Sequence, residues 1–300
     1  MIRKVKNTIK KLIIHRPKRN FRHFADLSVI LKKFCTKLPS DIDLIVGIPR
    51  SGIVPAYMMA QFLNKSCCSL DEFINRDKIE HFHSGHSFRN SINQAKNVLI
   101  VDDSIYSGSS ITEVKRCINK CDTRGCSIKY AAIFAKKGST NKVDYYAEIC
   151  DTPRIFQWNY MRCPNACYDI DGVLCLDPTK EQNDDGEKYL DFIKNAKPLF
   201  IPKNAFALVT SRLEKYRKPT EEWLEKNKIK YDNLYMLNLS SKKERIKLGC
   251  YAEFKANIYK NLKNTVLFIE SEPAQAKDIA HLSGKPCVCS WTDEFFDGSS

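Results

Sequence analysis

The sequence lacks any apolar run long enough to cross a membrane, which takes roughly 18 residues or more. The apolar piece Leu12-Ile13-Ile14 near the N-terminus is far shorter, and it does not form the hydrophobic part of a secretory signal. Low-complexity tracts and internal repeats are also missing, which excludes the disordered and solenoid classes. We therefore expect a globular protein of the cytoplasm, either free or bound at the inner face of the membrane.

Cysteine is plentiful, but its arrangement excludes two common roles. The chain has 13 cysteines, an odd number spread over a sequence too long for a small disulfide scaffold. Cys163 and Cys167 have a spacing that suits zinc, yet no second pair at ligand spacing accompanies them. We therefore expect reduced cysteines with structural roles and no metal-thiolate site.

Positive charge is in excess, with a formal net charge of +14. Such a charge attracts phosphate groups, nucleic acid or anionic lipid. It is concentrated in the basic segment 1–19, where Ile2, Val5, Ile9 and Leu12 recur at roughly helical spacing. Two interpretations stay open for this segment: a helix on an anionic membrane surface, or a solvated helix that packs on its own domain. No RNA-recognition motif with interleaved aromatic residues is present, so nucleic acid is not an expected partner.

The order of apolar segments predicts the α/β class. At 300 residues the chain is long enough for two domains with separate cores. The pattern predicts a buried strand over 44–48, followed by a turn and a helix, and then a strand over 97–101 with a helix at about 110–120. We expect two doubly wound domains, residues 20–162 and 163–300, each with a mainly parallel sheet flanked by helices.

Two adjacent carboxylates, Asp102 and Asp103, follow the second of these strands. Like charges repel, so such a pair at a strand tip favours a cationic or hydroxyl-rich ligand. The stretch SGSS at 107–110 then supplies a glycine turn and free backbone N–H groups at a helix N-terminus, which suits a phosphate dianion. One ligand with a diol and a phosphate would satisfy both features. For the serine-rich stretch alone, an ordinary solvated helix cap is the alternative.

From Asp102 to residue 110 the sequence resembles the ribose-phosphate signature of type I phosphoribosyltransferases, with serine in place of the usual threonines. The resemblance, over roughly residues 20–160, implies that Asp102 and Asp103 bind the ribose hydroxyls of phosphoribosyl pyrophosphate (PRPP). The stretch GIPRSG resembles the family's loop for pyrophosphate and magnesium, although the family often has glycine in place of the serine. The further PRPP-binding residues implied by these two loops are Arg50, Ser51, Gly52, Tyr106, Ser107, Gly108, Ser109 and Ser110.

Between these loops, residues 75–91 are polar and rich in histidine, at the place where such transferases carry a mobile loop that closes over the reaction. Its basic side chains are candidates for contacting pyrophosphate or for deprotonating the acceptor. A solvated loop explains them almost as well, so the sequence does not single out a base. The side chains concerned are Lys78, His81, His83, His86 and Arg89.

The second half again places acids at the end of an apolar strand. The strand 166–168 is followed by Asp169, Asp171 and a glycine turn, so that one carboxylate can attack in line while the next moves a proton. Farther along, an apolar strand ends in Thr210, and the stretch AEFK contributes Lys255. A last apolar strand ends in two glutamates, Glu270 and Glu272.

These residues, in this order, resemble the four motifs of the haloacid dehalogenase superfamily of phosphatases, over roughly residues 165–295. The resemblance implies that Asp169 is a nucleophile that forms an aspartyl-phosphate and that Asp171 is the general acid/base. It implies that Thr210 donates a hydrogen bond to the phosphate and that Lys255 stabilises charge.

The resemblance also implies a Mg²⁺ ion held by Asp169, the carbonyl of Asp171 and an acid of the last motif. Glu270 stands where the family commonly has aspartate, and Mg²⁺ tolerates little error in its octahedral shell. Either Glu270 or Glu272 is therefore the third ligand. Lys242 and Lys243 compete with Lys255 for the third motif, but a solvated face is the better interpretation for them.

Joined in one chain, the two resemblances imply two consecutive reactions. The first domain would transfer 5-phosphoribose from PRPP to an acceptor, and the second would remove the 5-phosphate to leave ribofuranose. The acceptor that we expect is a hydroxyl of a bacterial surface glycan, for example a lipid-linked one. Two alternatives stay open: a nucleobase phosphoribosyltransferase coupled to a nucleotide phosphatase, and a PRPP-sensing regulator that binds RNA.

Overall fold

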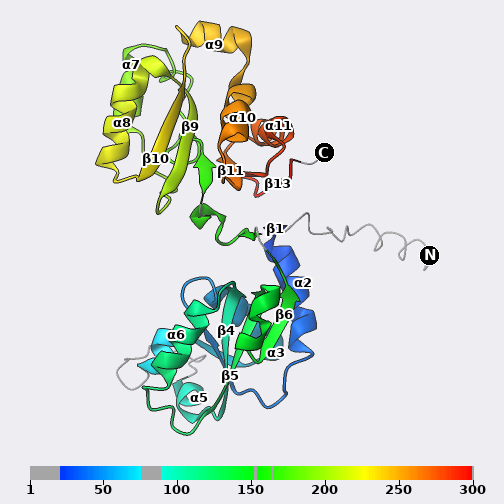
Figure 1. Ribbon diagram of the computed structural model, residues 1–300. Coiled ribbons are helices and arrows are strands. Elements are labelled where there is room, and N and C mark those ends of the chain that lie inside the picture. The colour runs from blue at the N-terminus through cyan, green and yellow to red at the C-terminus, as the bar shows by residue number, and fades with distance from the viewer. Residues whose placement is uncertain (1–20, 76–88, 152–153, 164, 299–300) are drawn as a thin grey trace, which may run out of the picture. The chain divides into compact units, whose positions relative to one another are not determined.

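The computed structural model describes residues 21–75, 89–151, 154–163 and 165–298. The chain divides into two compact units, residues 1–158 and 159–300 (Figure 1). The predictions for the basic segment 1–19 and for residues 76–88 of the histidine-rich loop lie outside the described residues, whereas Arg89 of that loop begins a helix. Among the described helices, none is both long and apolar enough to cross a membrane. All 13 cysteines have free thiols, and many of them are buried.

The first unit is built on a five-stranded sheet in the order β3-β2-β4-β5-β6, with every pair of neighbours parallel. Its strands are β2 (Leu44–Gly47), β3 (Ser66–Ser69), β4 (Asn97–Ile105), β5 (Ser127–Ala135) and β6 (Tyr145–Ile149). Its described helices are α2 (Phe24–Cys35), α3 (Ile53–Leu63), α4 (Leu70–Ile74), α5 (Arg89–Gln94), α6 (Ser109–Ile118) and the 3₁₀ segment η1 (Lys137–Lys142). A short parallel pair, β1 (Phe21–Arg22) and β7 (Ile155–Phe156), lies outside this sheet.

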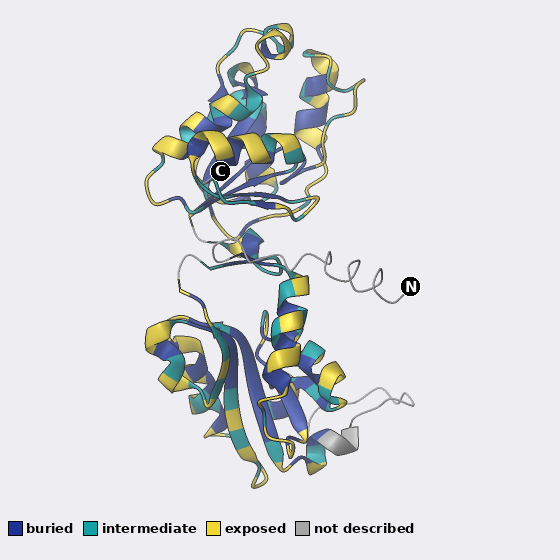
Figure 2. Ribbon diagram, turned by 90° about the vertical axis from the view of Figure 1, so that its right-hand side faces the viewer, coloured by how far each residue is buried: buried dark blue, intermediate teal, exposed yellow. Residues whose placement is uncertain are grey.

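Helices cover both faces of this sheet, because its central strand is apolar on both sides (Figure 2). Successive side chains of a strand point to opposite faces. Val98 and Ile100 of β4 pack in one core with residues of α4, α5 and α6. Leu99 and Val101 pack in the other core with residues of α2 and α3. The doubly wound arrangement predicted for this part of the chain is therefore confirmed.

The second unit has a six-stranded sheet in the order β10-β9-β8-β11-β12-β13, parallel except for the edge strand β13. Its strands are β8 (Ala166–Tyr168), β9 (Ala205–Leu213), β10 (Tyr231–Leu237), β11 (Leu267–Glu270), β12 (Cys287–Cys289) and β13 (Phe295–Phe296). Its helices are α7 (Glu187–Asn195), α8 (Arg217–Lys226), α9 (Lys242–Leu248), α10 (Tyr251–Asn261) and α11 (Pro273–Ser283), with 3₁₀ segments η2 (Tyr160–Arg162) and η3 (Glu214–Tyr216). Mainly parallel sheets flanked by helices are thus found in both units, as predicted.

Two strands run farther than the sequence indicated. Strand β4 continues through Asp102 and Asp103 to Ile105, because β5 keeps pairing with it as far as Ala135. Strand β9 likewise continues past Thr210 to Leu213. In both cases polar residues were interpreted as the end of a strand, although the neighbouring strand still supplies hydrogen-bond partners.

Candidate active sites

The acid pair lies near the carboxyl end of β4, the central strand of the first sheet, beyond the point where the neighbouring strand β2 ends. Strand β2 pairs with β4 only as far as Val101, opposite Gly47, so Asp102 and Asp103 extend beyond it at the carboxyl end of the sheet. Both are nevertheless buried, with 8% and 5% of their surface exposed. Open parallel sheets bind ligands at this end of their strands. The two carboxylates therefore lie at the end of the sheet that is available to a ligand, and their binding of a ribose stays a prediction.

Burial raises the pKa of Asp102 to about 7, and the negative charge of Asp103 adds to the effect. Burial also raises the pKa of Asp103, against the lowering effect of its hydrogen bonds with Trp158 and Ser104. The positive charge of Arg154 lowers the pKa of both acids, but it does not offset their burial. A site of this kind is poorly solvated and gains from a ligand that donates hydrogen bonds to the carboxylates.

One neighbour of the acid pair, Trp158, has no signal in the sequence. The indole Nε1 of Trp158 donates a hydrogen bond to Asp103 Oδ2 at 2.9 Å. The ring of Trp158 stacks on Phe156 with centroids 4.9 Å apart, and Phe156 stacks on Phe134 at the same distance. This aromatic stack fixes the orientation of the indole and hence of the Asp103 carboxyl group. A tryptophan 55 positions away in the sequence carries no local signal of such a contact.

The loop after β4 has the geometry expected of a phosphate-binding turn. Helix α6 begins at Ser109, one residue before the predicted start, and Gly108 precedes it with a left-handed φ of +77°. This φ favours glycine, because other residues rarely adopt it. The hydroxyls of Ser107 and Ser109 are 3.0 Å apart. The N–H of Ser109 donates to Ser107 Oγ at 3.3 Å. The other N–H groups of the first turn of α6 have no partner within the helix, as at any helix start, and this suits an anion.

Residues 136–142, a basic segment after β5, hold this loop through contacts that local sequence patterns do not predict. Lys142 Nζ donates to the carbonyl oxygen of Ser107 at 2.5 Å. The hydroxyl of Ser139 donates to the carbonyl oxygen of Tyr106. Lys136 Nζ lies 4.2 Å from the centroid of the Tyr106 ring, and the Arg154 guanidinium carbon lies 5.3 Å from the same centroid. These cations would strengthen the attraction of the loop for a phosphate group.

The other implied loop, between β2 and α3, approaches the acid pair closely. A Cβ atom at Gly52 would lie 2.7 Å from the carbonyl oxygen of Val101 and 3.0 Å from the Cα of Asp102. Glycine is thus required there by contact with β4. In the same loop Arg50 is exposed and Ser51 is half-buried.

We predict that Asp102→Asn makes the protein more stable at neutral pH. The pKa of Asp102 is about 7 in the folded state and near 4 in an unfolded chain, so between these values only the folded state binds the proton. The stability contributed by this group therefore falls as pH rises from about 4 to about 7. The free energy of unfolding of Asp102→Asn should therefore exceed that of the wild type by an amount that grows over this range to roughly 2 to 4 kcal/mol. Urea unfolding at a series of pH values measures it.

Asp41→Asn is the matched control, because Asp41 is exposed in the same unit. It removes one acid from the surface and leaves the buried pair intact, so it reports the effect of a lost surface charge alone. An advantage of Asp102→Asn that is equal at pH 4 and pH 8 would contradict the assigned pKa.

In the second unit the nucleophile predicted from the sequence lies at the centre of the sheet. Strand β8 lies between β9 and β11, and Asp169 follows it directly, with its N–H bonded to the carbonyl oxygen of Ile269 at 3.0 Å. Lys255 of α10 reaches this point from the face of the sheet. Its Nζ lies 2.6 Å from Asp169 Oδ2 and 2.7 Å from Glu270 Oε2. All three side chains are almost fully buried.

Burial and ion pairing act in opposite directions in this cluster. Burial raises the pKa of Asp169, and the ammonium group of Lys255 opposes that shift. Burial works against the charged form of Lys255, but the charges of Asp169 and Glu270 outweigh it and raise the pKa of its ammonium group. We conclude that Lys255 is held as a cation between two carboxylates.

Asp171 and Thr210 border the same cluster. Thr210 is fully buried on β9, and its Oγ1 accepts a hydrogen bond from the N–H of Arg212 at 3.2 Å. The carbonyl oxygen of Asp171 accepts a hydrogen bond from Ser271 Oγ at 3.3 Å. The carboxylate of Asp171 does not contact Lys255; it pairs with Arg212, with a shortest distance of 2.6 Å. The residues predicted for the four motifs thus come together at one end of the sheet, with Arg212 as an additional member.

The two glutamates of the last motif have different roles in the fold. Glu270 faces Lys255, whereas Glu272 is the N-cap of α11 and accepts hydrogen bonds from the N–H groups of Ala274 and Gln275. Lys242, which the sequence offered as an alternative to Lys255, donates a hydrogen bond to the carbonyl oxygen of Asn183. Glu270, rather than Glu272, therefore belongs to the cluster around Asp169.

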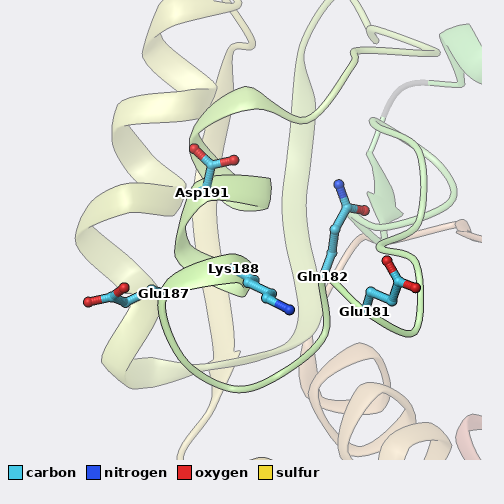
Figure 3. A pocket seen from close by; sticks show the side chains of 5 residues that line it. All are labelled: Glu181, Gln182, Glu187, Lys188 and Asp191. Carbon is cyan, nitrogen blue, oxygen red and sulfur yellow. The ribbon is translucent and has the colours of Figure 1, made fainter.

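A separate pocket of about 430 Å³ in this unit is acidic (Figure 3). Glu187, Lys188 and Asp191 of α7 line one side of it, and Glu181 and Gln182 of the preceding loop line the other. Three carboxylates against one ammonium group repel a phosphate ester. We therefore place no phosphate chemistry in this pocket.

Comparison with known proteins supports the interpretation of the first unit. Residues 22–164 match the family model of the phosphoribosyl transferase domain. No curated protein sequence matches the chain.

Among solved structures, the chain is similar to the xanthine-guanine-hypoxanthine phosphoribosyltransferase of Helicobacter pylori, with 16% identity and a TM-score of 0.35 over 47% of this chain and 93% of that one. It is also similar to a purine phosphoribosyltransferase of Pyrococcus horikoshii, with 20% identity and a TM-score of 0.32 over 46% and 91% of the two chains. On the match of the family model, the protein contains a phosphoribosyl transferase domain at residues 22–164.

Proposed function

We propose that the protein is a bifunctional enzyme. Its first unit transfers 5-phosphoribose from PRPP to a hydroxyl acceptor, and its second unit removes the 5-phosphate to leave a ribofuranosyl group. The family match supports the first step. The observation that carries the second step is the buried Lys255 ammonium group bonded to both Asp169 and Glu270 at the end of a parallel sheet. An enzyme that only made nucleotides, or a PRPP sensor, would have no use for this cluster.

In the first reaction, Asp102 and Asp103 accept hydrogen bonds from the ribose hydroxyls, and the N–H groups of the loop 106–110 bind the 5-phosphate. Arg50, Ser51 and Gly52 face the pyrophosphate. The bond between C1 and the pyrophosphate oxygen breaks, and pyrophosphate leaves with the electron pair. The acceptor oxygen attacks C1 from the opposite side, and its proton passes to water. The acid pair holds the ribose while positive charge develops on its ring.

In the second reaction, the Asp169 carboxylate attacks phosphorus and forms an aspartyl-phosphate. The ester oxygen leaves as an alcohol, taking a proton from Asp171. Water then attacks the aspartyl-phosphate and gives a proton to Asp171, which releases phosphate and restores the enzyme. Lys255 and Thr210 neutralise and bind the phosphoryl oxygens. Phosphate-monoester hydrolysis is among the slowest uncatalysed reactions, so several such groups must act together.

The residues near Asp169 fit a magnesium ion by their chemistry. Asp169, Glu270 and the carbonyl oxygen of Asp171 are all oxygen donors, which Mg²⁺ prefers. No group of three or more histidine, cysteine, aspartate or glutamate side chains in the described part of the chain could hold a metal ion. The proposed set has only two such side chains, with a backbone carbonyl as the third donor. When bound, the ion would neutralise the charge of the phosphoryl group.

We predict that Glu270→Gln raises the Mg²⁺ concentration needed for phosphate release by about 10-fold or more, because it replaces a negatively charged metal ligand with a neutral one. Glu272→Gln should leave the Mg²⁺ dependence unchanged, since both Glu272 oxygens are engaged at the start of α11. Its cost should be limited to about 1 kcal/mol of stability from the weakened helix cap. Phosphate release at a series of Mg²⁺ concentrations distinguishes the two variants. The reverse result would make Glu272 the ligand.

The acceptor is a hydroxyl of a growing surface glycan in this proposal, because removing the 5-phosphate leaves plain ribofuranose on it. A nucleobase is the competing acceptor. To test the proposal, the purified chain is incubated with Mg²⁺ and PRPP, together with purines, uracil or orotate in one series and with candidate free and lipid-linked glycans in another. Pyrophosphate release and product mass are measured. We expect turnover only with glycans; robust turnover with any base would overturn this choice of acceptor.

A further inference from the structure

Arg212 of β9 is completely buried, and its main partner is the carboxylate of Asp171. Its side chain is 0% exposed, whereas that of Asp171 is 18% exposed. Arg212 Nη2 lies 2.6 Å from Asp171 Oδ1, and Nε lies 3.2 Å from Oδ1 and 3.1 Å from Oδ2. Both carboxylate oxygens are therefore within hydrogen-bond distance of one guanidinium group. The Asp171 side chain cannot rotate without breaking these bonds.

Several elements hold Arg212 in place. Its Nη1 lies 3.4 Å from Thr220 Oγ1, and Nη2 lies 3.4 Å from Cys175 Sγ. The rings of Phe192 on α7 and Trp223 on α8 each have their centroid 5.9 Å from the guanidinium carbon. The orientation of Trp223 is itself fixed by a hydrogen bond from Nε1 to the carbonyl oxygen of Ala196. This rigid surrounding determines the direction in which Arg212 presents its donors.

Stability does not explain this arrangement. Taking two charges out of water costs free energy, and replacing a buried ion pair with well-packed apolar residues is often neutral or stabilising. The pair is also asymmetric, because the arginine is wholly enclosed while the carboxylate keeps some contact with solvent. In such a geometry the guanidinium group binds the carboxylate from the protein interior, and the solvent-exposed part of the carboxylate is available to a substrate.

We propose that Arg212 is a positioning residue that fixes the Asp171 carboxyl group for proton transfer to the leaving oxygen of the phosphate ester. The proposal rests on the phosphatase function proposed above. When the P–O ester bond breaks, the electron pair goes to the leaving oxygen, which takes the proton of Asp171. Arg212 holds the resulting carboxylate in place until it accepts a proton from the attacking water. Arg212 itself touches neither the substrate nor the phosphorus atom.

The proposal makes a prediction that depends on the leaving group. An alkyl ester such as ribose 5-phosphate leaves as a strong base and needs the proton, whereas p-nitrophenyl phosphate leaves as a weak base and does not. General acid catalysis is worth about 10²- to 10⁴-fold. We expect Arg212→Gln and Arg212→Lys to lower kcat on ribose 5-phosphate by about 10²-fold or more and on p-nitrophenyl phosphate by less than about 10-fold. KM should change little, because Arg212 does not bind substrate.

Arg212→Lys keeps the positive charge but loses the planar fork that engages both oxygens. Arg217→Gln is the matched control, because Arg217 pairs with Glu214 and Glu221 near the surface of the same unit. It should leave both activities at the wild-type level. Circular dichroism and thermal unfolding report whether each variant is folded.

A second comparison is used if Arg212→Gln and Arg212→Lys unfold. The double variant Asp171→Asn/Arg212→Met removes both charges of the pair, so that neither is buried without its partner. Its activity is compared with that of Asp171→Asn. We expect the two to have the same residual activity, since Arg212 acts only through Asp171. Equal losses on both substrates, or a further large loss in the double variant, would show that Arg212 has a different role. A wild-type protein without any phosphatase activity would instead overturn the proposed function itself.

Discussion

Replacing Asp102 and Asp103 together by alanine will abolish the formation of product from PRPP. Each carboxylate would accept a charge-assisted hydrogen bond from a ribose hydroxyl, and such bonds contribute about 1.5 to 3 kcal/mol each. Losing both should lower the rate of pyrophosphate release by about 10²- to 10⁴-fold. Pyrophosphate release with PRPP and the glycan acceptor measures the effect. The phosphatase activity of the second unit on ribose 5-phosphate should remain.

The double variant needs two controls. Removing Asp103 leaves Trp158 Nε1 without its acceptor, which costs roughly 1 to 3 kcal/mol of stability. Asp102→Asn/Asp103→Asn keeps the shape of both side chains and should be folded but equally inactive. Asp41→Ala removes an exposed acid from the same unit and should have no effect. Retention of PRPP turnover by both double variants would show that the acid pair does not bind the ribose.

The sequence predicted those parts of the first site that are contiguous along the chain. The apolar strand, the acid pair and the glycine turn before α6 lie within about 15 residues, and each has a local physical signature. The contact of Trp158 with Asp103 joins residues 55 positions apart, and the bond of Lys142 to Ser107 joins residues 35 positions apart. Such contacts depend on which strands are neighbours in the sheet, which local periodicity does not determine.

Arg212 illustrates a different limit of sequence interpretation. A charged residue after an apolar strand usually marks the start of a solvated loop, because arginine is almost never fully buried without a partner. Here β9 continues to Leu213, and the partner is Asp171, 41 positions away. The choice between Glu270 and Glu272 was equally undecidable from the sequence. Glu270 ends β11 and Glu272 lies two residues later, and only the start of α11 shows that Glu272 is engaged as a helix cap.

Asp169→Ala will separate the two proposed reactions. Without the nucleophile, the second reaction should slow by about 10⁴-fold or more, as in other enzymes that lose a covalent nucleophile. PRPP should still be consumed and pyrophosphate released at the wild-type rate. The glycan product should therefore accumulate with one additional phosphate group, which mass spectrometry of the product detects. Adding the wild-type protein, or an unrelated phosphatase, should convert it to the ribofuranosyl product.

The Asp169→Ala protein should remain folded, because Lys255 keeps Glu270 as a partner at 2.7 Å and no cation is left buried alone. Asp169→Asn, which keeps the size of the side chain but not its nucleophilicity, should stall at the same product. Asp232→Ala, which removes an exposed acid from the same unit, should give the wild-type product. A product of Asp169→Ala that already lacks the phosphate would contradict the assigned order, because the phosphate would then have been lost without the residue proposed to attack it.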